Sequence, residues 1–435
     1  MSFLKQFAHK STSAKRLASA YLSKFNSKSN TADSQLKGNI TILLRQERQN
    51  VAGLCKVYFQ LALNTDHINE QQQLEMQVLS GDDELGRFSI ANNNISQENW
   101  LAINTHKLNN GKHKFTLQLL LDKEPQLYNS FAISIKNEGP LANKVSNSLK
   151  QSNSPTIIYK DCNSRLFDFQ NEDLKPWFDK SNAHQRLEQK AEEHPIAKQY
   201  KSEFESFLTH GFMVLENILD DKFIENINRD IDDAVKKKVQ GYEEGSSQRI
   251  MGLHNSYKHI HQLWKQAKVI QILEQIFEDA VRPCQTLTYV YGSQQSYHQD
   301  TVHLTPFPAG YMCGVWVALE DIKAGSGELR VLKGSHRLPR IYRETSNCSQ
   351  VIDNQWDEFS QTVDKEWQRL IAEHKFEEMS YLAKKGDILI WHENLMHGGS
   401  VRIDNNQSRR SIVSHYFAQG ALGFYDSSGL PAVLD

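Results

Sequence analysis

The stretch GDILIWHE, Gly386–Glu393, joins an apolar run of strand length to a histidine and a glutamate at its end. Similar apolar runs occur on both sides of it: TLTYVYG (286–292), YMCGVWVALE (311–320), GELRVLKG (327–334) and RRSIVSHYF (409–417). Short apolar runs separated by polar turns are typical of β-strands. The sequence therefore predicts a β-barrel or jelly-roll core over about residues 285–420.

Two amphipathic segments precede this core. LDDKFIENINRDIDDAVKKK (219–238) places its apolar residues on one helical stripe, with acidic residues early and lysines late, as the helix dipole favours. HQLWKQAKVIQILEQIF (261–277) has a second such stripe and predicts a second helix. Helices followed by a run of strands indicate an α+β domain, mostly β, over residues 157–435, with a helical lead-in to about residue 280.

The N-terminal third has a different character. Residues 38–140 contain alternating apolar runs such as VYFQLAL (57–63) and KFTLQLLLD (114–122), separated by polar turns. This pattern predicts a small β-sandwich-like accessory domain over residues 37–143. The Ser/Asn-rich segment 144–156 is expected to be a linker. Residues 1–36 are basic, without an acidic residue before Asp33, and are expected to be a mobile tail, with a membrane- or partner-docking helix as the alternative.

Composition restricts the partners and the compartment. The chain has 50 basic and 52 acidic residues and a net charge of -2, which argues against nucleic acid as the main partner. It has no apolar run long enough to span a bilayer and no apolar core of a secretory signal. The five cysteines are scattered and form no CxxC pair, which favours reduced thiols in a cytoplasmic protein.

The segment SYHQDTVHL (296–304) indicates a metal site. In an extended chain His298 and Asp300 point the same way, so they offer an imidazole and a carboxylate to one point. A third ligand is expected from WHENLMHGGS (391–400), where His392 and His397 compete. Two histidines and one carboxylate suit non-heme Fe(II), because three positions remain open for oxygen and a bidentate co-substrate.

An arginine follows at strand spacing in SRRSIVSHYF (408–417). If this segment is a strand, Arg409, Ser411, Val413 and His415 share one face. The Arg409 guanidinium could then bind a carboxylate in a two-pronged pair, with the Ser411 hydroxyl beside it. Arg410 competes for this role, although the Arg-x-Ser phase favours Arg409. An organic acid such as 2-oxoglutarate could bridge the arginine and the metal.

These pieces together resemble a known family. The segments FLTHGFMVLENILDDKFIENI, GSQQSYHQD, VWVALEDIKAGSGELRVLKGSHR, KKGDILIWHENLMHGGS and RRSIVSHYF, in this order over about residues 200–420, are similar to the phytanoyl-CoA dioxygenase family of Fe(II)/2-oxoglutarate oxygenases. The resemblance implies a double-stranded β-helix (jelly-roll, cupin-like) core with flanking helices. It implies that Fe(II) is held by His298, Asp300 and His397, and that 2-oxoglutarate is held by Arg409.

The resemblance also bears on neighbouring residues. It favours His397 over His392, because relatives have a glycine directly after the ligand, and it places Trp316 at the co-substrate pocket. His303 is expected on the pocket rim, and His336 is interpreted as a turn residue. Halogenating relatives have a small residue where this chain has Asp300, so hydroxylation is expected.

The substrate is not identified by these motifs. A small-molecule or carrier-bound metabolite is expected, oxidised with O2 and 2-oxoglutarate to give succinate and CO2. A non-catalytic binding protein on the same scaffold, or a cupin-type metalloenzyme without 2-oxoglutarate, are the alternatives. For the accessory domain the candidate partners are a glycan, a lipid, a carrier protein or a second subunit.

Overall fold

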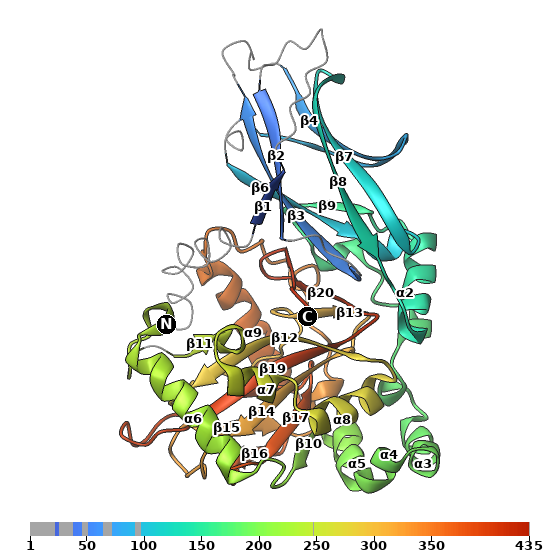
Figure 1. Ribbon diagram of the computed structural model, residues 1–435. Helices are drawn as coiled ribbons and strands as arrows, with labels where there is room; N and C mark the ends of the chain where they lie inside the picture. Colours follow the sequence, from blue (N-terminus) through green and yellow to red (C-terminus); the bar gives the residue numbers. More distant parts are fainter. Residues whose placement is uncertain are drawn as a thin grey trace. The chain divides into compact units, whose positions relative to one another are not determined.

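The computed structural model describes residues 22–25, 38–45, 51–63, 72–91, 97–246 and 248–434. These residues form two compact units (Figure 1). The N-terminal unit contains the described residues up to Asp168 together with Gly429–Pro431, and the C-terminal unit contains Phe169–Ser428 and the described residues after Pro431. The division therefore lies at 168/169, twelve residues after the predicted start of the second domain at 157, and the assignment of separate domains stays a prediction.

Two antiparallel sheets make up the N-terminal unit. The five-stranded sheet has the order β1-β2-β3-β6-β9 and the four-stranded sheet the order β5-β4-β7-β8. Their strands are β1 (Leu22–Phe25), β2 (Gly38–Arg45), β3 (Leu54–Leu63), β4 (Leu74–Ser80), β5 (Asp83–Ser89), β6 (Glu98–Asn104), β7 (Gly111–Leu121), β8 (Glu124–Ile135) and β9 (Ile157–Tyr159).

Alternating apolar residues bury one face of each sheet. Phe115 and Leu117 of β7 are fully buried, and so are Val57 and Phe59 of β3, as the alternation predicted. One hydrophobic cluster contains residues of both sheets, so the two sheets share a core. A shared core between two sheets is what a sandwich requires, and the sandwich topology itself stays a prediction.

The predicted linker is wrong over most of its length. Residues Pro140–Gln151 form helix α2, which buries Leu141, Val145 and Leu149. These residues lie four apart, so they follow one face of the helix despite the Ser/Asn-rich composition between them. Proline at the first helical position and the positive φ of 105° at Gly139 favour a helix start there.

Most of the predicted tail, residues 1–36, lies outside the described residues, and so does its alternative as a docking helix. The exception is β1, which pairs with β2 in antiparallel fashion, Leu22 opposite Arg45. For these four residues the prediction of a mobile tail is wrong, because their backbone belongs to the five-stranded sheet.

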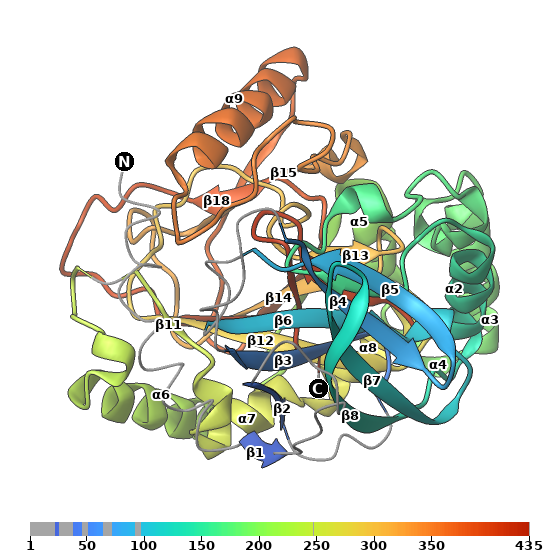
Figure 2. The same cartoon turned by 90° about the horizontal axis from the view of Figure 1, so that it is seen from above.

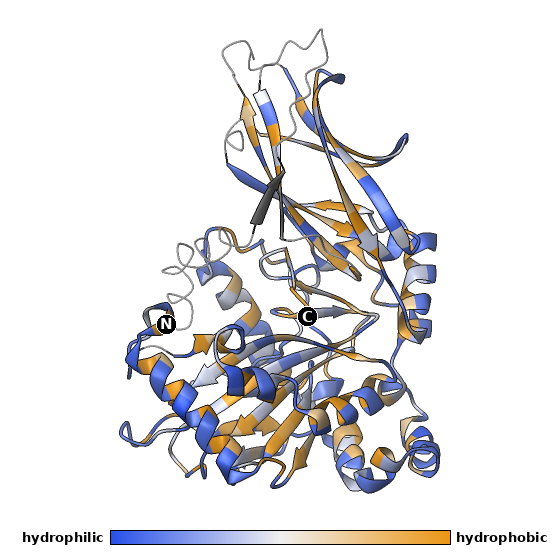
Figure 3. Ribbon diagram, in the orientation of Figure 1, coloured by the Kyte–Doolittle hydropathy of each residue, from blue (hydrophilic) through white to orange (hydrophobic). Residues whose placement is uncertain are grey.

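Helices flank the sheets of the C-terminal unit. They are α3 (Ala183–Glu193), α4 (Pro195–Gln199), α5 (Lys201–His210), α6 (Asp221–Lys236), α7 (Lys258–Trp264), α8 (Ala267–Phe277) and α9 (Asp357–Glu373), with short 3₁₀ turns such as η6 (Trp177–Asp179) and η9 (Ser335–Arg337). Figure 3 shows hydrophilic and hydrophobic positions alternating along α6, whose buried residues include Ile224, Ile227 and Ile231. This confirms the first predicted helix.

The second predicted helix is two helices. Helix α7 ends at Trp264 and α8 begins at Ala267. The side chain of Gln266 accepts hydrogen bonds from the backbone amides of Lys268 and Val269 at 2.6 and 3.1 Å, so it caps the start of α8. The segment has no proline or glycine to indicate this break, and the apolar stripe continues across it.

Antiparallel strands form the centre of the C-terminal unit. A six-stranded sheet has the order β10-β17-β14-β19-β12-β11, a three-stranded sheet has the order β16-β15-β18, and β13 pairs with β20. Their strands are β10 (Phe212–Leu215), β11 (Ile250–Met251), β12 (Val281–Tyr289), β13 (Thr305–Phe307), β14 (Met312–Ala318), β15 (Leu329–Leu332), β16 (Glu378–Tyr381), β17 (Ile388–His392), β18 (His397–Gly399), β19 (Ser411–Ala418) and β20 (Leu422–Tyr425). Each apolar run quoted for this region overlaps one of these strands.

A second core lies between the two larger sheets. It contains Trp316 and Leu389 from the six-stranded sheet and Leu329 and Val331 from the three-stranded sheet. Helix α9 covers the other side of β15, where its Val363 and Trp367 join a separate cluster (Figure 2). The predicted fold class, mostly β with antiparallel sheets and flanking helices, is confirmed, while the double-stranded β-helix topology stays a prediction.

Among the helices that the structure describes, none has the length and the apolar character that a bilayer crossing needs.

Candidate metal centre

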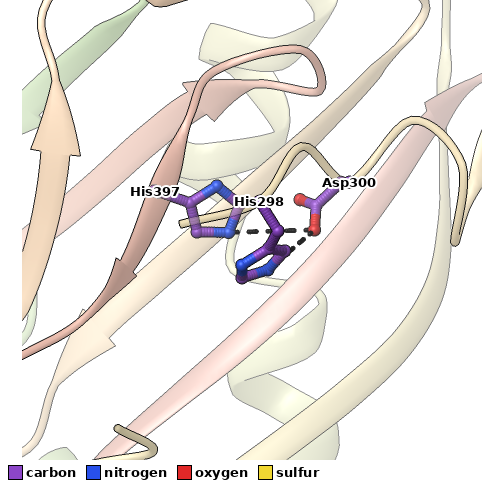
Figure 4. A group of neighbouring side chains, drawn as sticks. All are labelled: His298, Asp300 and His397. Carbon is purple, nitrogen blue, oxygen red and sulfur yellow. Dashed lines mark ion pairs between the residues drawn. The ribbon is translucent and has the colours of Figure 1, made fainter. Parts of the chain in front are cut away.

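The three predicted ligands come together (Figure 4). His298 and Asp300 lie on the segment after β12, and His397 is the first residue of β18. The backbones of His298 and His397 form an antiparallel bridge, each amide donating to the carbonyl of the other at 3.0 and 3.1 Å. The amide of Asp300 donates to the Glu393 carbonyl at 3.1 Å. Strand pairing, rather than side-chain contact, therefore sets the spacing of the cluster.

Their ligand atoms can converge on one ion. One nitrogen of each histidine and one oxygen of Asp300 all lie within 4.8 Å of one another. The Nε2 atoms of His298 and His397 are 3.9 and 3.7 Å from Asp300 Oδ1. Each Nδ1 lies 2.9 Å from a backbone carbonyl, that of Ser296 or Leu395, and donates to it. This fixes the proton on Nδ1 and leaves the Nε2 lone pair for a metal.

The charges of the cluster also suit a divalent cation. Burial, with His397 nearby, lowers the pKa of His298 to about 3, so its imidazole is neutral. Burial would raise the pKa of Asp300, but the histidines at 397, 415 and 298 together hold it well below its usual range, so the carboxylate is charged. Two imidazoles and one carboxylate are the donor set of a facial triad, and these residues therefore fit Fe(II).

The glycines of β18 let the segment that leads into His298 lie close against this strand. A Cβ on Gly398 would meet the Gln295 carbonyl oxygen at 2.7 Å, and one on Gly399 would meet the Ser293 hydroxyl at 2.8 Å. Both neighbours are parts of the chain that leads directly into His298. The small residues after His397 are therefore a packing requirement of the site, which gives a physical reason for the glycine that follows the ligand.

His392, the competing histidine, lies in a different cluster. Its ring nitrogens are 2.8 Å from Glu393 and 3.3 Å from Asp179. Arg340 donates to the same two carboxylates, at 2.8 and 2.9 Å. His392 and Glu393 are almost completely buried. These contacts link η6 to the turn after β17. His392 is therefore part of a buried ion network and not of the metal cluster.

This network predicts a stability effect. Burial alone would lower the pKa of His392, but Glu393 and Asp179 raise it to about 9. Because this exceeds the ordinary value of about 6.5, the stabilisation is complete below pH ~6.5 and is lost as the pH rises through about 9. Breaking a buried pair costs roughly 3–5 kcal/mol. We expect His392→Ala to lower the unfolding free energy by this amount near pH 6.

Urea unfolding in the presence of a chelator would measure the difference between wild type and His392→Ala at several pH values. The difference should shrink toward pH 9, and Fe(II) affinity at pH 7 should be nearly unchanged. A His392→Ala protein that is as stable as wild type near pH 6, or that loses iron while folded, would contradict this account.

Arg409 lies in the core, and Arg410 does not. The guanidinium of Arg409 is buried and donates to the Gly327 carbonyl at 3.1 Å and to the Ser411 hydroxyl at 2.6 Å. Neither of these partners is charged. Burial lowers the pKa of Arg409 to about 10, so it stays protonated at neutral pH. Arg410 instead donates to Asp232 on α6 at 2.6 Å, which is partly exposed.

The surroundings of Arg409 could hold an organic acid. Its guanidinium carbon lies 5.4 Å from the Tyr289 ring centre and 5.7 Å from that of Trp316. The Trp316 indole nitrogen is buried and, within the described part of the chain, has no hydrogen-bond partner. A buried cation without an anionic hydrogen-bond partner and an unused N–H donor beside it suit a carboxylate. The predicted residues Arg409, Ser411 and Trp316 are thus brought together.

The other two histidines lie apart from the ligand atoms. The half-buried ring of His303 is 6.0 Å from each of the Trp356, Phe359 and Trp367 rings. Its place on a pocket rim stays a prediction. His336 lies in the short 3₁₀ turn η9, which begins directly after Gly334, a residue with a φ of 81°. This backbone conformation agrees with the interpretation of His336 as a turn residue.

Residues 207–411 match the model of the phytanoyl-CoA dioxygenase (PhyH) family. This part of the chain is a PhyH-family domain. The match lies within the C-terminal unit and includes all three ligand residues and Arg409. It confirms the resemblance inferred from the motifs over about residues 200–420.

Solved structures resemble the PhyH domain only distantly. One is the non-heme alpha-ketoglutarate-dependent carbocyclase SnoK from nogalamycin biosynthesis, with 14% identity, 54% of this chain and 88% of that chain covered, and a TM-score of 0.41. Another is EctD from S. alaskensis with 2-oxoglutarate and 5-hydroxyectoine, with 18% identity, 49% and 74% covered, and a TM-score of 0.37. No curated protein matches the sequence.

Several residues that touch the metal cluster were missed by sequence reasoning. The Trp391 indole donates to Asp300 Oδ2 at 2.8 Å, and His415 Nε2 lies 3.4 Å from the same oxygen. The Gln295 amide nitrogen lies 3.4 Å from His298 Nε2. The shared face of Arg409 and His415 was visible in the sequence, but the pairing that brings His415 to Asp300 was not.

Proposed function

We propose that the PhyH domain is an Fe(II)- and 2-oxoglutarate-dependent dioxygenase. The reaction would hydroxylate an unactivated C–H bond of a small-molecule or carrier-bound metabolite, with release of succinate and CO2. The proposal rests on one combined observation. A buried cluster of His298, Asp300 and His397 and the buried cation Arg409, which donates to two neutral groups, both contact one hydrophobic core. Trp391 of this core donates to Asp300, and Trp316 of the same core lies beside Arg409.

The three ligands would hold Fe(II) through His298 Nε2, His397 Nε2 and Asp300 Oδ1. Three protein ligands leave three further positions of an octahedral ion open. The side chains of all three residues are at least 88% covered, so the ion would be bound away from bulk water. When bound, Fe(II) with 2-oxoglutarate supplies the oxidising chemistry by reacting with O2, and the protein positions and shields the reactants.

Arg409 would bind the far carboxylate of 2-oxoglutarate. Arg409 lies two residues before β19, and the alternation of an extended chain puts it on the same face as Ser411 and His415 of that strand, of which His415 contacts Asp300. One face of the sheet therefore leads from the ligand cluster to the buried arginine. Ser411 already takes one N–H of Arg409 and orients it, and Trp316 offers a further N–H donor. A guanidinium fork matches a carboxylate in a bidentate pair.

Single features of the chain support the type of reaction, the need for 2-oxoglutarate and the location. A carboxylate at Asp300 occupies the position that a halide would need, which favours hydroxylation. A cupin-type metalloenzyme that works without 2-oxoglutarate would not need a buried arginine to bind a carboxylate, so Arg409 argues against this alternative. We also propose a cytoplasmic location, because the five cysteines are scattered along the sequence and form no CxxC pair. The N-terminal unit is proposed as an accessory domain for a glycan, lipid, carrier protein or second subunit.

The function is tested by turnover of 2-oxoglutarate. We expect the protein with Fe(II), ascorbate and air to convert 2-oxoglutarate to succinate slowly, and faster when a metabolite library contains the substrate. His397→Ala should abolish both rates, and Arg410→Ala should retain them. A wild-type protein that binds iron yet forms no succinate with or without the library would contradict the proposal. Binding of 2-oxoglutarate without turnover would favour a binding protein instead.

A further inference from the structure

The two oxygens of Asp300 have different surroundings. Oδ1 faces the Nε2 atoms of His298 and His397, at 3.9 and 3.7 Å. Oδ2 accepts a hydrogen bond from the Trp391 indole at 2.8 Å and lies 3.4 Å from His415 Nε2. Trp391 is 1% exposed and His415 4% exposed, so neither contact competes with bulk water. One oxygen is directed to the metal position and the other is directed into the sheet.

A chain of hydrogen bonds fixes which nitrogen of His415 carries the proton. The Gln285 amide nitrogen lies 3.2 Å from His415 Nδ1, and an amide N–H can only donate. The Tyr425 hydroxyl donates to the other end of that amide, Gln285 Oε1, at 3.2 Å, which sets its orientation. His415 Nδ1 is therefore an acceptor. Its proton is on Nε2 and points to Asp300 Oδ2.

The pairing register of the strands positions the side chains of this hydrogen-bond chain. Gln285 lies opposite His415 in the β12–β19 pair, directly after a shift in register between Pro283 and Gln285. An irregularity of this kind re-aims side chains, and bulges are common beside active sites. Trp391 and His415 lie opposite Gly314 of β14, one from each neighbouring strand. A Cβ on Gly314 would meet the Trp391 ring at 2.2 Å, so this glycine makes the room in which the indole reaches Asp300.

We propose that Trp391 and His415, supported by Gln285 and Tyr425, hold Asp300 as a one-oxygen ligand and thereby keep a metal position open for 2-oxoglutarate. This inference rests on the proposed function. A carboxylate oxygen has two acceptor sites, and the two donors use both sites of Oδ2. Without them, Asp300 could rotate and chelate the metal with both oxygens. The added bond would retain the metal but would occupy a position that the bidentate co-substrate needs.

The test compares metal affinity with co-substrate affinity. We expect Trp391→Phe and His415→Leu to bind Fe(II) or Co(II) about as tightly as wild type. Their 2-oxoglutarate binding should weaken by roughly 10- to 100-fold, taking the size of the loss in metal affinity or activity that is typical when partners of metal ligands are removed. His415→Gln keeps an N–H donor at a similar reach and should recover most of the lost affinity. Tyr425→Phe, which keeps its ring, should show a smaller loss in the same direction.

A direct readout accompanies the titrations. X-ray absorption of the Co(II) proteins without 2-oxoglutarate should place the carboxylate carbon of Asp300 closer to the metal in Trp391→Phe and His415→Leu than in wild type, because chelation by both oxygens draws that carbon in while a water ligand leaves. Arg410→Ala, whose side chain pairs with Asp232, is the control and should resemble wild type in every measurement. Circular dichroism and thermal melting establish that each variant is folded.

The inference is overturned if metal and co-substrate affinities fall together without rescue by His415→Gln, or if neither changes. If wild type binds metal but no 2-oxoglutarate, the proposed function fails, and the Co(II) measurement still decides about Asp300. A carboxylate carbon at the wild-type distance from the metal in the folded variants would then overturn the inference, and a shorter distance would support the one-oxygen role.

Discussion

Replacement of His298, Asp300 or His397 by alanine is expected to abolish Fe(II) binding and all oxidation while the fold is retained. Each change removes one of three protein ligands, and the two that remain do not hold Fe(II) against water. The backbone bridge between His298 and His397 uses amides and carbonyls, so it does not depend on these side chains. Anaerobic equilibrium dialysis with Fe(II), together with circular dichroism, measures both parts of the expectation.

His303→Ala is a matched control for the histidine variants. His303 lies five residues after His298, and none of its atoms belongs to the ligand cluster. We expect this variant to keep near wild-type iron affinity. If His298→Ala, Asp300→Ala or His397→Ala instead kept near wild-type iron binding and turnover, the ligand assignment would be wrong at that position.

Arg409→Ala is expected to cost 2-oxoglutarate affinity without affecting iron. The substitution would leave a buried carboxylate without its partner, at a cost of roughly 2–5 kcal/mol. At about 1.4 kcal/mol per tenfold, binding should weaken by a factor on the order of 30 to several thousand. Arg409 donates to Gly327 and Ser411 and to none of the metal ligands, so Fe(II) affinity should barely change.

Arg410→Ala is the control for Arg409→Ala. It separates the loss of the 2-oxoglutarate-binding side chain from a general effect of removing a positive charge next to β19. Arg410 pairs with the partly exposed Asp232 at the surface, and its loss should leave 2-oxoglutarate binding nearly unchanged. Titration of 2-oxoglutarate into each anaerobic Fe(II) protein compares the two variants. The opposite outcome, a large loss for Arg410→Ala and none for Arg409→Ala, would exchange the two roles.

Local patterns predicted most strands but not every connection. Most strands of both units follow alternating or continuous apolar runs, because the side chains that a strand buries set its sequence pattern. The mostly polar β5 and β16 are exceptions. The error at α2 came from composition. Serine, asparagine and a following proline indicated a linker, although Leu141, Val145 and Leu149 already had helical spacing. The division between α7 and α8 had no apolar signal, because it depends on the cap made by Gln266.

For the candidate site, too, the sequence predicted some of the residues and missed others. His298, Asp300 and Arg409 could be named from short spacings, and His397 was preferred over His392 through the glycine that follows it. The contacts of Trp391 and His415 with Asp300 required the register of β17, β14 and β19, which no local pattern specifies. The ion network of His392 likewise depends on Asp179, more than two hundred residues away in the chain.

The central claim is that one buried site holds both Fe(II) and 2-oxoglutarate. It is tested most directly by adding 2-oxoglutarate to the anaerobic Fe(II) protein and recording the visible absorption. The account predicts a saturable charge-transfer band in the wild type that is absent in His397→Ala and needs much higher 2-oxoglutarate concentrations in Arg409→Ala. Absence of the band in an iron-loaded wild type, or an equal band in His397→Ala, would contradict it.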